Sequence, residues 1–349
     1  MTPCGCGITD IHTHVVPEHF PAYLGKHLNV PWPSTAEAHA CHRHVMISGS
    51  VYRTVSHQCW SAPVRLSDMD ARGINRQVLS PMPELLSYWL EPEDGAQLCR
   101  FLNETIATIC ADHPSRFSGL AAVPMQSLEH AIAEMDYAVH TLEMPGVEIG
   151  GNVNDRPIGD PYFAPFFEAA ERWNAAVFVH ALRPSGMDRL VGPAHLQQVL
   201  AFPGEVGLAA ASMITGGHLT RFPKLRMAFS HGGGTLAMLL PRLQHAWSTL
   251  PPLRSAIPTS PIEAARTLFF DNLVYDAPTI HRLIQVFGLK QVMVGSDYPF
   301  SIMDADPKAR LESLDLPAAD LELLAHGNAE RWLLGSLVER SQQLGWTPQ

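Results

Sequence analysis

The chain has 349 residues, of which 46% are hydrophobic and 17% are charged, a composition typical of a folded protein with a large core and unlike that of a disordered chain. Its 24 Lys and Arg residues are outnumbered by 34 Asp and Glu residues, which gives a formal net charge of −10. An acidic chain without a basic cluster argues against nucleic acid and anionic membrane surfaces as partners. It does not exclude a small acidic substrate, because a few local arginines can bind one.

The cysteines and the apolar runs bear on where the protein resides. The first ten residues lack a charged start followed by an apolar stretch, so we expect no secretory signal. Cysteines in a long chain without such a signal are typical of a reducing compartment, and we expect a cytoplasmic protein. No apolar run approaches the ~18 residues of a membrane-spanning helix. The six cysteines are Cys4, Cys6, Cys41, Cys59, Cys99 and Cys110.

Short apolar runs alternate along the chain with stretches of helical periodicity. We predict eight strands, at Ile8–Val15, Gln77–Pro81, Ser118–Val123, Val147–Val153, Ala175–Ala181, Leu225–Ser230, Leu268–Val274 and Gln291–Ser296. Helices are predicted between most of them, including Leu66–Gly73, Ala96–Asp112, Leu128–Leu142, Tyr162–Trp173 and Thr279–Phe287. Strands that alternate with helices imply parallel pairing with right-handed crossovers. Eight such units predict a TIM (β/α)₈ barrel of the α/β class.

Two segments depart from the alternation. Residues 16–64, rich in Pro, His and Ser, lie between the first strand and its helix, and we interpret them as an insertion at the active-site face of the barrel. Residues 318–349 are expected to form C-terminal helices outside the barrel. No linker is long enough to divide the chain, so residues 1–349 are expected to form one barrel domain.

The first predicted strand carries two histidines in alternate positions, in the run Asp10-Ile11-His12-Thr13-His14. Because side chains alternate across a strand, His12 and His14 share one face, where two imidazoles can bind one ion. Taken alone, such a pair is more often two ordinary histidines than a metal site.

Three later strands also end in polar residues. The fifth ends in His180, the sixth in His231 followed by three glycines, and the eighth in Asp297. The carboxyl ends of barrel strands meet around one mouth, so these side chains are expected to converge with His12 and His14. Four polar strand ends in one barrel are hard to explain by packing, and we interpret them as a metal site.

The residue types indicate the ion and a proton carrier. His12, His14, His180 and Asp297 would offer three imidazoles and one carboxylate, which suit Zn²⁺ with one position open for water. Mn²⁺ or Co²⁺ are alternatives, because His and Asp ligands accept several ions. His231 is the candidate acid–base group, since imidazole titrates near neutral pH.

Beyond single motifs, the chain resembles the decarboxylase branch of the amidohydrolase superfamily from about residue 8 to residue 335. The resemblance rests on segments of the metal site and on segments without a metal role, such as Val51-Tyr52-Arg53. The former are Asp10-Ile11-His12-Thr13-His14, Phe178-Val179-His180, Ser230-His231-Gly232-Gly233-Gly234 and Gly295-Ser296-Asp297-Tyr298-Pro299-Phe300.

The resemblance implies a non-oxidative decarboxylase of an unsaturated or aromatic carboxylic acid. It implies a metal held by the four residues above, with His231 as acid–base group and Asp297 also part of the catalytic set. It further implies substrate contacts from Arg53, from the aromatic ring of Phe300, and from Arg242, which in the family reaches the neighbouring subunit of a homodimer. Taken alone, either arginine would more often be a solvated surface charge.

Two alternatives remain open, because the same residues could serve them. The first is a metal-dependent hydrolase or hydratase acting on a related ring-cleavage-type acid, and the second is a barrel that binds such an acid without catalysis.

One segment departs from the family pattern. Family members typically continue the fifth-strand histidine with Pro-Trp, whereas here His180 is followed by Ala181-Leu182-Arg183-Pro184. The loop forms one wall of the substrate pocket in the family, so the departure leaves the identity of the acid open. Arg183 is either a further carboxylate contact or a surface charge.

Overall fold

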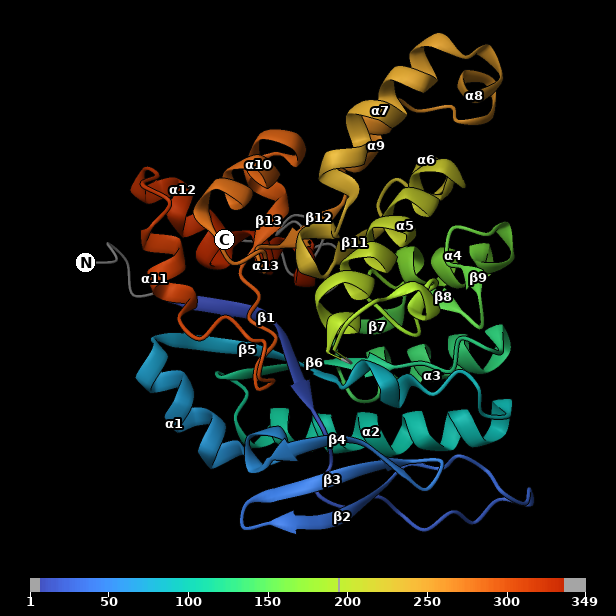
Figure 1. The fold of residues 1–349 in the computed structure, drawn as a ribbon, viewed down its shortest axis with the longest axis vertical. Coiled ribbons are helices and arrows are strands. Elements are labelled where there is room, and N and C mark those ends of the chain that lie inside the picture. Colours follow the sequence, from blue (N-terminus) through green and yellow to red (C-terminus); the bar gives the residue numbers. More distant parts are fainter. Residues whose placement is uncertain (1–6, 194, 336–349) are drawn as a thin grey trace, which may run out of the picture.

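Eight parallel strands form a nearly closed barrel in the computed structural model, which describes residues 7–193 and 195–335 (Figure 1). In spatial order they are β1 (Ile8–Val15), β5 (Ile74–Pro81), β6 (Phe117–Ala122), β7 (Gly146–Gly150), β10 (Ala176–His180), β11 (Arg226–Phe229), β12 (Phe269–Asp271) and β13 (Val292–Met293). This order follows the sequence, as right-handed crossovers require. The predicted TIM barrel is confirmed.

The barrel closes between β1 and the segment after β13 through backbone hydrogen bonds. The amide of Ile11 donates to the carbonyl of Val294 at 2.9 Å, and the amide of Asp297 donates to the carbonyl of His12 at 2.8 Å. Each of the eight predicted strands has a counterpart, but three predictions are wrong in extent, among them Leu268–Val274, of which only Phe269–Asp271 forms a strand. The predicted Val147–Val153 is divided between β7 and a short separate strand, β8 (Asn152–Val153), which pairs with β9 (Arg156–Pro157). The predicted Gln291–Ser296 is reduced to two strand residues.

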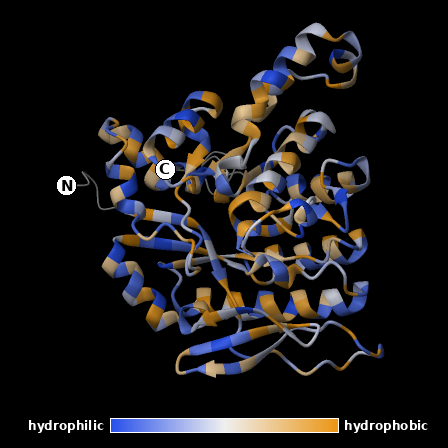
Figure 2. Ribbon diagram, viewed as in Figure 1, coloured by the Kyte–Doolittle hydropathy of each residue, from blue (hydrophilic) through white to orange (hydrophobic). Residues whose placement is uncertain are grey.

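Helices surround the barrel, and the longer ones each bury one face against it. The longer ones are α1 (Ala62–Arg72), α2 (Pro92–Asp112), α3 (Leu128–His140), α4 (Ala164–Arg172), α5 (Phe202–Thr215), α7 (Leu236–Thr249) and α10 (Ala277–Phe287). The shorter ones are α6 (His218–Arg221), α8 (Pro251–Ala256), α9 (Pro261–Ala265), α11 (Pro307–Glu312), α12 (Ala318–Glu322) and α13 (Asn328–Leu334). Hydrophobic and hydrophilic residues alternate along α2, as expected of a helix with one buried face (Figure 2).

Between β1 and α1 the chain forms a separate antiparallel sheet, for which the sequence analysis predicted no strands. Its strands are β2 (Ser34–His39), β3 (His42–Ile47) and β4 (Ser50–Ser56), joined by tight turns (Figure 1). Val45 and Val55 are buried, while much of β2 is exposed. Polar and histidine residues interrupt the alternation of buried and exposed positions, so the sequence pattern did not reveal these strands. This sheet matters for function because β4 carries Arg53.

The amino-terminal end of the barrel is filled. Trp332 of α13 is fully buried and packs against Phe178 inside the barrel, with ring centroids 5.9 Å apart. Residues 336–349 of the expected C-terminal helices, and Cys4 and Cys6, lie outside the described residues. The carboxyl end of the barrel is therefore the end at which a ligand can reach the strands.

Within the described residues, no helix has both the length and the apolar character needed to cross a membrane.

Candidate metal centre and substrate pocket

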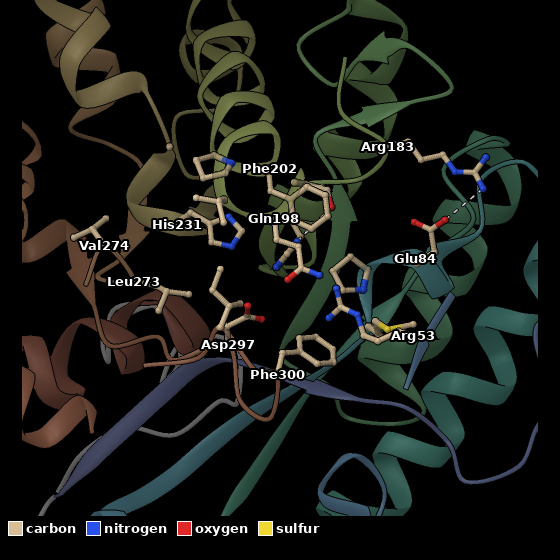
Figure 3. A pocket seen from close by; sticks show the side chains of 18 of the residues that line it. Arg53, Glu84, Arg183, Gln198, Phe202, His231, Leu273, Val274, Asp297 and Phe300 are labelled. Atoms are coloured by element: carbon tan, nitrogen blue, oxygen red, sulfur yellow. Dashed lines mark hydrogen bonds and ion pairs between the residues drawn. The ribbon is translucent and has the colours of Figure 1, made fainter. Parts of the chain in front are cut away.

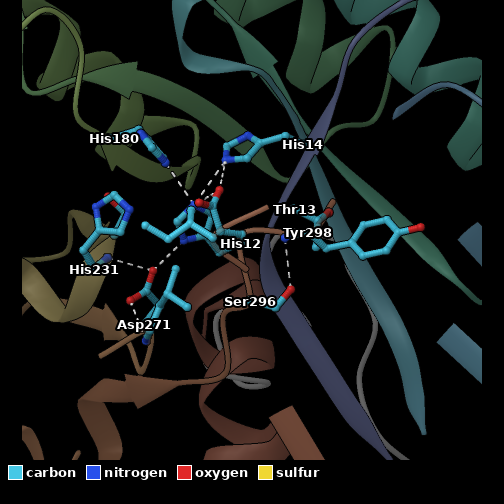
Figure 4. Close-up of polar contacts among 12 residues, drawn as sticks. His12, Thr13, His14, His180, His231, Asp271, Ser296 and Tyr298 are labelled. Carbon is cyan, nitrogen blue, oxygen red and sulfur yellow. Dashed lines mark hydrogen bonds and ion pairs between the residues drawn. The ribbon is translucent and has the colours of Figure 1, made fainter. Parts of the chain in front are cut away.

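Four predicted ligands converge at the carboxyl end of the barrel. His12 and His14 come from β1, His180 ends β10, and Asp297 follows β13. All four are buried, and their ligand atoms lie within 4.8 Å of one another. His12 Nε2 lies 3.1 Å from His14 Nε2 and 2.9 Å from His180 Nε2, and Asp297 Oδ1 lies 3.2 Å from His14 Nε2 (Figure 4). Four donor atoms that point at one another form a site for a divalent metal.

The outward nitrogens of the histidines are held by other groups. His12 Nδ1 lies 2.7 Å from Asp271 Oδ2, and His14 Nδ1 lies 3.1 Å from the carbonyl oxygen of Pro81. Such partners fix the ring and the tautomer, so that Nε2 presents its lone pair to an ion.

Asp271, the last residue of β12, was missed by the sequence analysis. It ends a short apolar strand in a carboxylate, as Asp297 does near the eighth strand, so the same signal could have identified it. Besides His12, it accepts hydrogen bonds from the amides of His231 at 3.0 Å and Gly232 at 2.8 Å. Asp271 thus ties the metal ligand His12 to the loop that carries His231 (Figure 4).

The charges of this cluster are strongly coupled. Burial alone would lower the pKa of His12, but its contacts with Asp271 and Asp297 outweigh burial and raise that pKa to about 10. Burial raises the pKa of Asp297, but the hydrogen bonds and charges of His12 and His14 lower that pKa by more. The pKa of Asp297 therefore lies well below its usual range. The two carboxylates therefore attract one positive charge to this point, which a proton on His12 or a metal cation can supply.

His231 lies beside the ligand group rather than in it. Its ring centroid lies 5.1 Å from that of His180 and 5.4 Å from that of His12. Burial is the largest cause that lowers its pKa to about 4, so the imidazole is neutral at physiological pH.

The backbone at this turn is unusual. His231 has a φ of 53° and Asp297 a φ of 64°, a region that side chains other than glycine seldom adopt and that is concentrated at functional sites. Gly234 follows with a φ of 57°, and a Cβ there would lie 1.8 Å from the carbonyl oxygen of Pro203. The glycines after His231 therefore allow the turn to pack against α5.

A cavity of about 290 Å³ opens over the ligand group. His180, His231 and Asp297 line one side of it, and Arg53, Arg183 and Glu84 line another (Figure 3). The cavity has the size of a small organic acid rather than of a polymer.

Of the predicted substrate contacts, Arg53 and Phe300 lie in this cavity. The Arg53 guanidinium lies 4.2 Å from the centre of the Phe300 ring, which itself stacks on His14 with centroids 5.1 Å apart. Within the part of the chain that the structure describes, half-buried Arg53 forms no hydrogen bond or ion pair. Arg242 is exposed on α7 and does not line the cavity.

Two charged residues of the far wall face each other. Glu84, in the short 3₁₀ helix Pro83–Leu86 after β5, lies 3.4 Å from Arg183 Nη2. The Arg183 guanidinium also lies 3.3 Å from the centre of the Trp89 ring. The sequence analysis had left Arg183 as either a carboxylate contact or a surface charge, and it did not single out Glu84.

One further carboxylate is buried beneath the site. Glu148 of β7 is fully buried, and neither carboxylate oxygen has a hydrogen-bond partner among the described residues. Burial raises its pKa to about 8, so the neutral acid is favoured at physiological pH. The sequence analysis did not single out Glu148, although a charged residue within the short apolar run Gly-Val-Glu-Ile-Gly could have identified it.

The chain is similar to known proteins in both sequence and fold. Residues 9–334 match the amidohydrolase family. The chain is 35% identical to the 2-amino-3-carboxymuconate-6-semialdehyde decarboxylase of Dictyostelium discoideum over 327 residues, which cover 93% of this chain and 90% of that protein.

Two solved structures have the same fold. The IDCase of Metarhizium anisopliae superposes with a TM-score of 0.80 at 20% identity, covering 95% of this chain and 98% of that one. The 5-carboxyvanillate decarboxylase of Novosphingobium aromaticivorans superposes with a TM-score of 0.70 at 25% identity, covering 79% of this chain and 82% of that one. The second was solved as a point mutant with bound manganese and a nitrobenzoic acid.

Proposed function

Because the chain belongs to the amidohydrolase family, as the match over residues 9–334 and the 35% identity to a decarboxylase establish, we propose that it is a metal-dependent, non-oxidative decarboxylase of an unsaturated or aromatic carboxylic acid. The observation that carries the proposal is the placement of one cavity over both a four-residue ligand group and an arginine without an acidic partner among the described residues. The reaction class comes from the relatives, since the barrel alone supports many reactions.

The ligand group fits a divalent ion. Three imidazoles and one carboxylate in mutual contact are the donor set of Zn²⁺ in enzymes, and we propose Zn²⁺ as the resident ion, with Mn²⁺ or Co²⁺ as substitutes. Bound there, the ion would act as a Lewis acid that stabilises negative charge on the substrate.

The chain's own residues would bind the acid and move the proton. Arg53 can hold a substrate carboxylate through two parallel hydrogen bonds, while the Phe300 ring beneath it supports a planar acid. The bond between the carboxylate and its carbon breaks, CO₂ leaves, and the electron pair remains on that carbon. The carbon must then take up a proton. His231, neutral at rest, can accept a proton from the bound acid's polar group or from water and return it to the carbon.

The proposal is tested by following CO₂. The purified protein, stripped of metal and reloaded with Zn²⁺ or Mn²⁺, is incubated with 2-hydroxybenzoate-type and muconate-type acids, and CO₂ is measured together with consumption of the acid. Metal-dependent release of CO₂ in a 1:1 ratio with consumed acid is the expected result. Consumption of a related ester, amide or conjugated acid without CO₂ would instead establish the hydrolase or hydratase alternative. Binding without turnover of any acid would establish the binding protein.

We also propose a homodimer in which Arg242 completes the partner's pocket. Arg242 is exposed on α7, which extends with α8 away from the barrel (Figure 1), and neighbouring Met238 and Leu239 are 72% and 50% exposed. Large apolar side chains exposed together mark interaction surfaces. Sedimentation should give twice the chain mass, and mixing Arg242→Ala with His231→Asn subunits should restore activity that neither variant has alone.

A cytoplasmic location is part of the proposal. The four described cysteines, Cys41, Cys59, Cys99 and Cys110, are all free, as thiols are in a reducing compartment. Fractionation of cells that produce the protein tests this.

A further inference from the structure

The far wall of the cavity carries more charge than a single carboxylate needs. Arg53, Arg183 and Glu84 all line it, and the half-buried Tyr52 places its hydroxyl toward Glu84. Two cations and one anion leave the wall with an excess of one positive charge. In Figure 3, Arg183 and Glu84 lie on the opposite side of the pocket from His231 and Asp297, with Arg53 and Phe300 between the two groups.

We propose that Arg183 is a second anion anchor, which binds an acidic group at the end of the substrate remote from the metal, and that Glu84 holds the guanidinium in place until the acid arrives. This proposal rests on the proposed function, since it assumes that an acid occupies the cavity. It assigns the pocket to acids that carry two separate anionic groups.

The contact between Glu84 and Arg183 is one that a ligand can replace. It is a single approach of 3.4 Å, and the Arg183 side chain is 52% exposed. Exposed ion pairs contribute little to stability, because water screens them and both side chains lose freedom. A planar guanidinium with five N–H donors can make two parallel hydrogen bonds with an incoming carboxylate, which is the stronger arrangement.

The surroundings keep Arg183 oriented when its partner changes. The guanidinium stacks at 3.3 Å on Trp89, and this contact does not use its hydrogen-bond donors. The Arg183 backbone has a φ of 42°, so the loop after β10 turns sharply there. Glu84 also retains neighbours, since its side chain is only 12% exposed and faces Tyr52 and Arg53.

The test compares the binding of acids that differ by one carboxylate. Benzoate carries one, and benzene-1,3-dicarboxylate and benzene-1,4-dicarboxylate carry two. Dissociation constants are measured by calorimetry on the metal-loaded wild type and on Arg183→Gln. Arg189→Gln is the matched control, because Arg189 is an exposed arginine of the same loop that does not line the cavity.

We expect at least one dicarboxylate to bind the wild type more tightly than benzoate does, and Arg183→Gln to weaken that binding about tenfold, the loss of one charge-assisted contact. Benzoate binding should stay within about twofold, and Arg189→Gln should change neither. Glu84→Gln, which frees Arg183, should tighten dicarboxylate binding about two- to fivefold. Equal weakening of both classes by Arg183→Gln, no weakening of either, or no preference of the wild type for a dicarboxylate overturns the proposal. Because the assay measures binding, a protein that binds in this pattern but releases no CO₂ would refute the proposed function and leave the anchor standing.

Discussion

The two walls of the pocket are built from different parts of the fold. The wall with the metal ligands comes from the ends of β1 and β10 and from the segment after β13. His12 and His14 lie in the strand β1, which pairs with β5, and each has a buried hydrogen-bond partner. The opposite wall comes from β4, from the 3₁₀ helix after β5 and from the loop after β10, which meet through side chains rather than backbone ladders. Strand ends position groups accurately, while loops tolerate change. From this difference we expect the barrel to supply the chemistry and the loops to select the acid.

The strongest test of the strand wall is to remove its proton carrier. His231→Asn should reduce kcat by about 10²–10⁴, the usual contribution of a positioned acid–base group, while the bound metal remains. Steady-state kinetics and metal analysis of the same preparation measure both. His281→Asn, an exposed histidine on α10, is the control and should retain full activity. A kcat within tenfold of the wild type would exclude the acid–base role.

The next test keeps the ligands and changes only their support. Asp271→Asn retains the shape of the side chain but removes the charge beside His12 Nδ1, so metal affinity should fall about 10–100-fold. Titration of the metal against a chelator of known affinity measures it. Asp276→Asn, which changes an exposed helix cap on α10, should leave the affinity unchanged. An unaltered affinity in Asp271→Asn would mean that His12 needs no support from β12.

A substitution in the opposite, loop-built wall should change KM more than kcat. Arg53→Gln removes a guanidinium that forms no ion pair within the described residues, and KM for the acid should rise about 10–100-fold. The change in kcat should be smaller than that in His231→Asn. Arg43→Gln on the neighbouring strand β3 is the matched control, since Arg43 pairs with Glu18 outside the cavity. A fall in kcat with KM unchanged would place Arg53 in the chemical step.

The last test concerns the stability of the fold and the buried acid under the site. Between its ordinary pKa of 4.5 and its raised pKa of about 8, Glu148 keeps its proton in the folded chain and loses it in the unfolded chain. Unfolding free energy therefore falls as pH rises through that window and is level above it. Glu148→Gln removes this penalty and should stabilise the metal-free protein by on the order of 4 kcal/mol at pH 8 and by little at pH 4. Urea unfolding at both pH values measures it, and equal stabilisation at both would show that the carboxylate does not titrate.

The sequence predicted the barrel and its metal end because both rest on local signals. An apolar run that stops at His180 or Asp297 predicts both a strand and the polar side chain at its end. Asp271 was missed because the predicted strand Leu268–Val274 ran three residues past it, whereas the observed strand ends at Asp271. The sheet of β2–β4 was missed because histidines and short turns interrupt its period of two.

The pocket's far wall could not be predicted for a different reason. Glu84 and Arg183 are 99 residues apart, and neither stands at a strand end. Their pairing depends on how two loops meet over the barrel, which no local pattern records. The resemblance to relatives supplied Arg53, whereas Arg183 lies where the chain departs from them.

The hydrogen bond from the Asp297 amide to the His12 carbonyl lies on the seam where the barrel's first and last strands join. The same two residues contribute side chains to one coordination group, although 285 positions separate them in the chain. A cation bound there would join the two sides of that seam, which lies beside the two-residue strand β13. Amide hydrogen exchange along this edge should accordingly slow when metal is added, because an ion bound to both sides of the seam would stabilise the closed barrel.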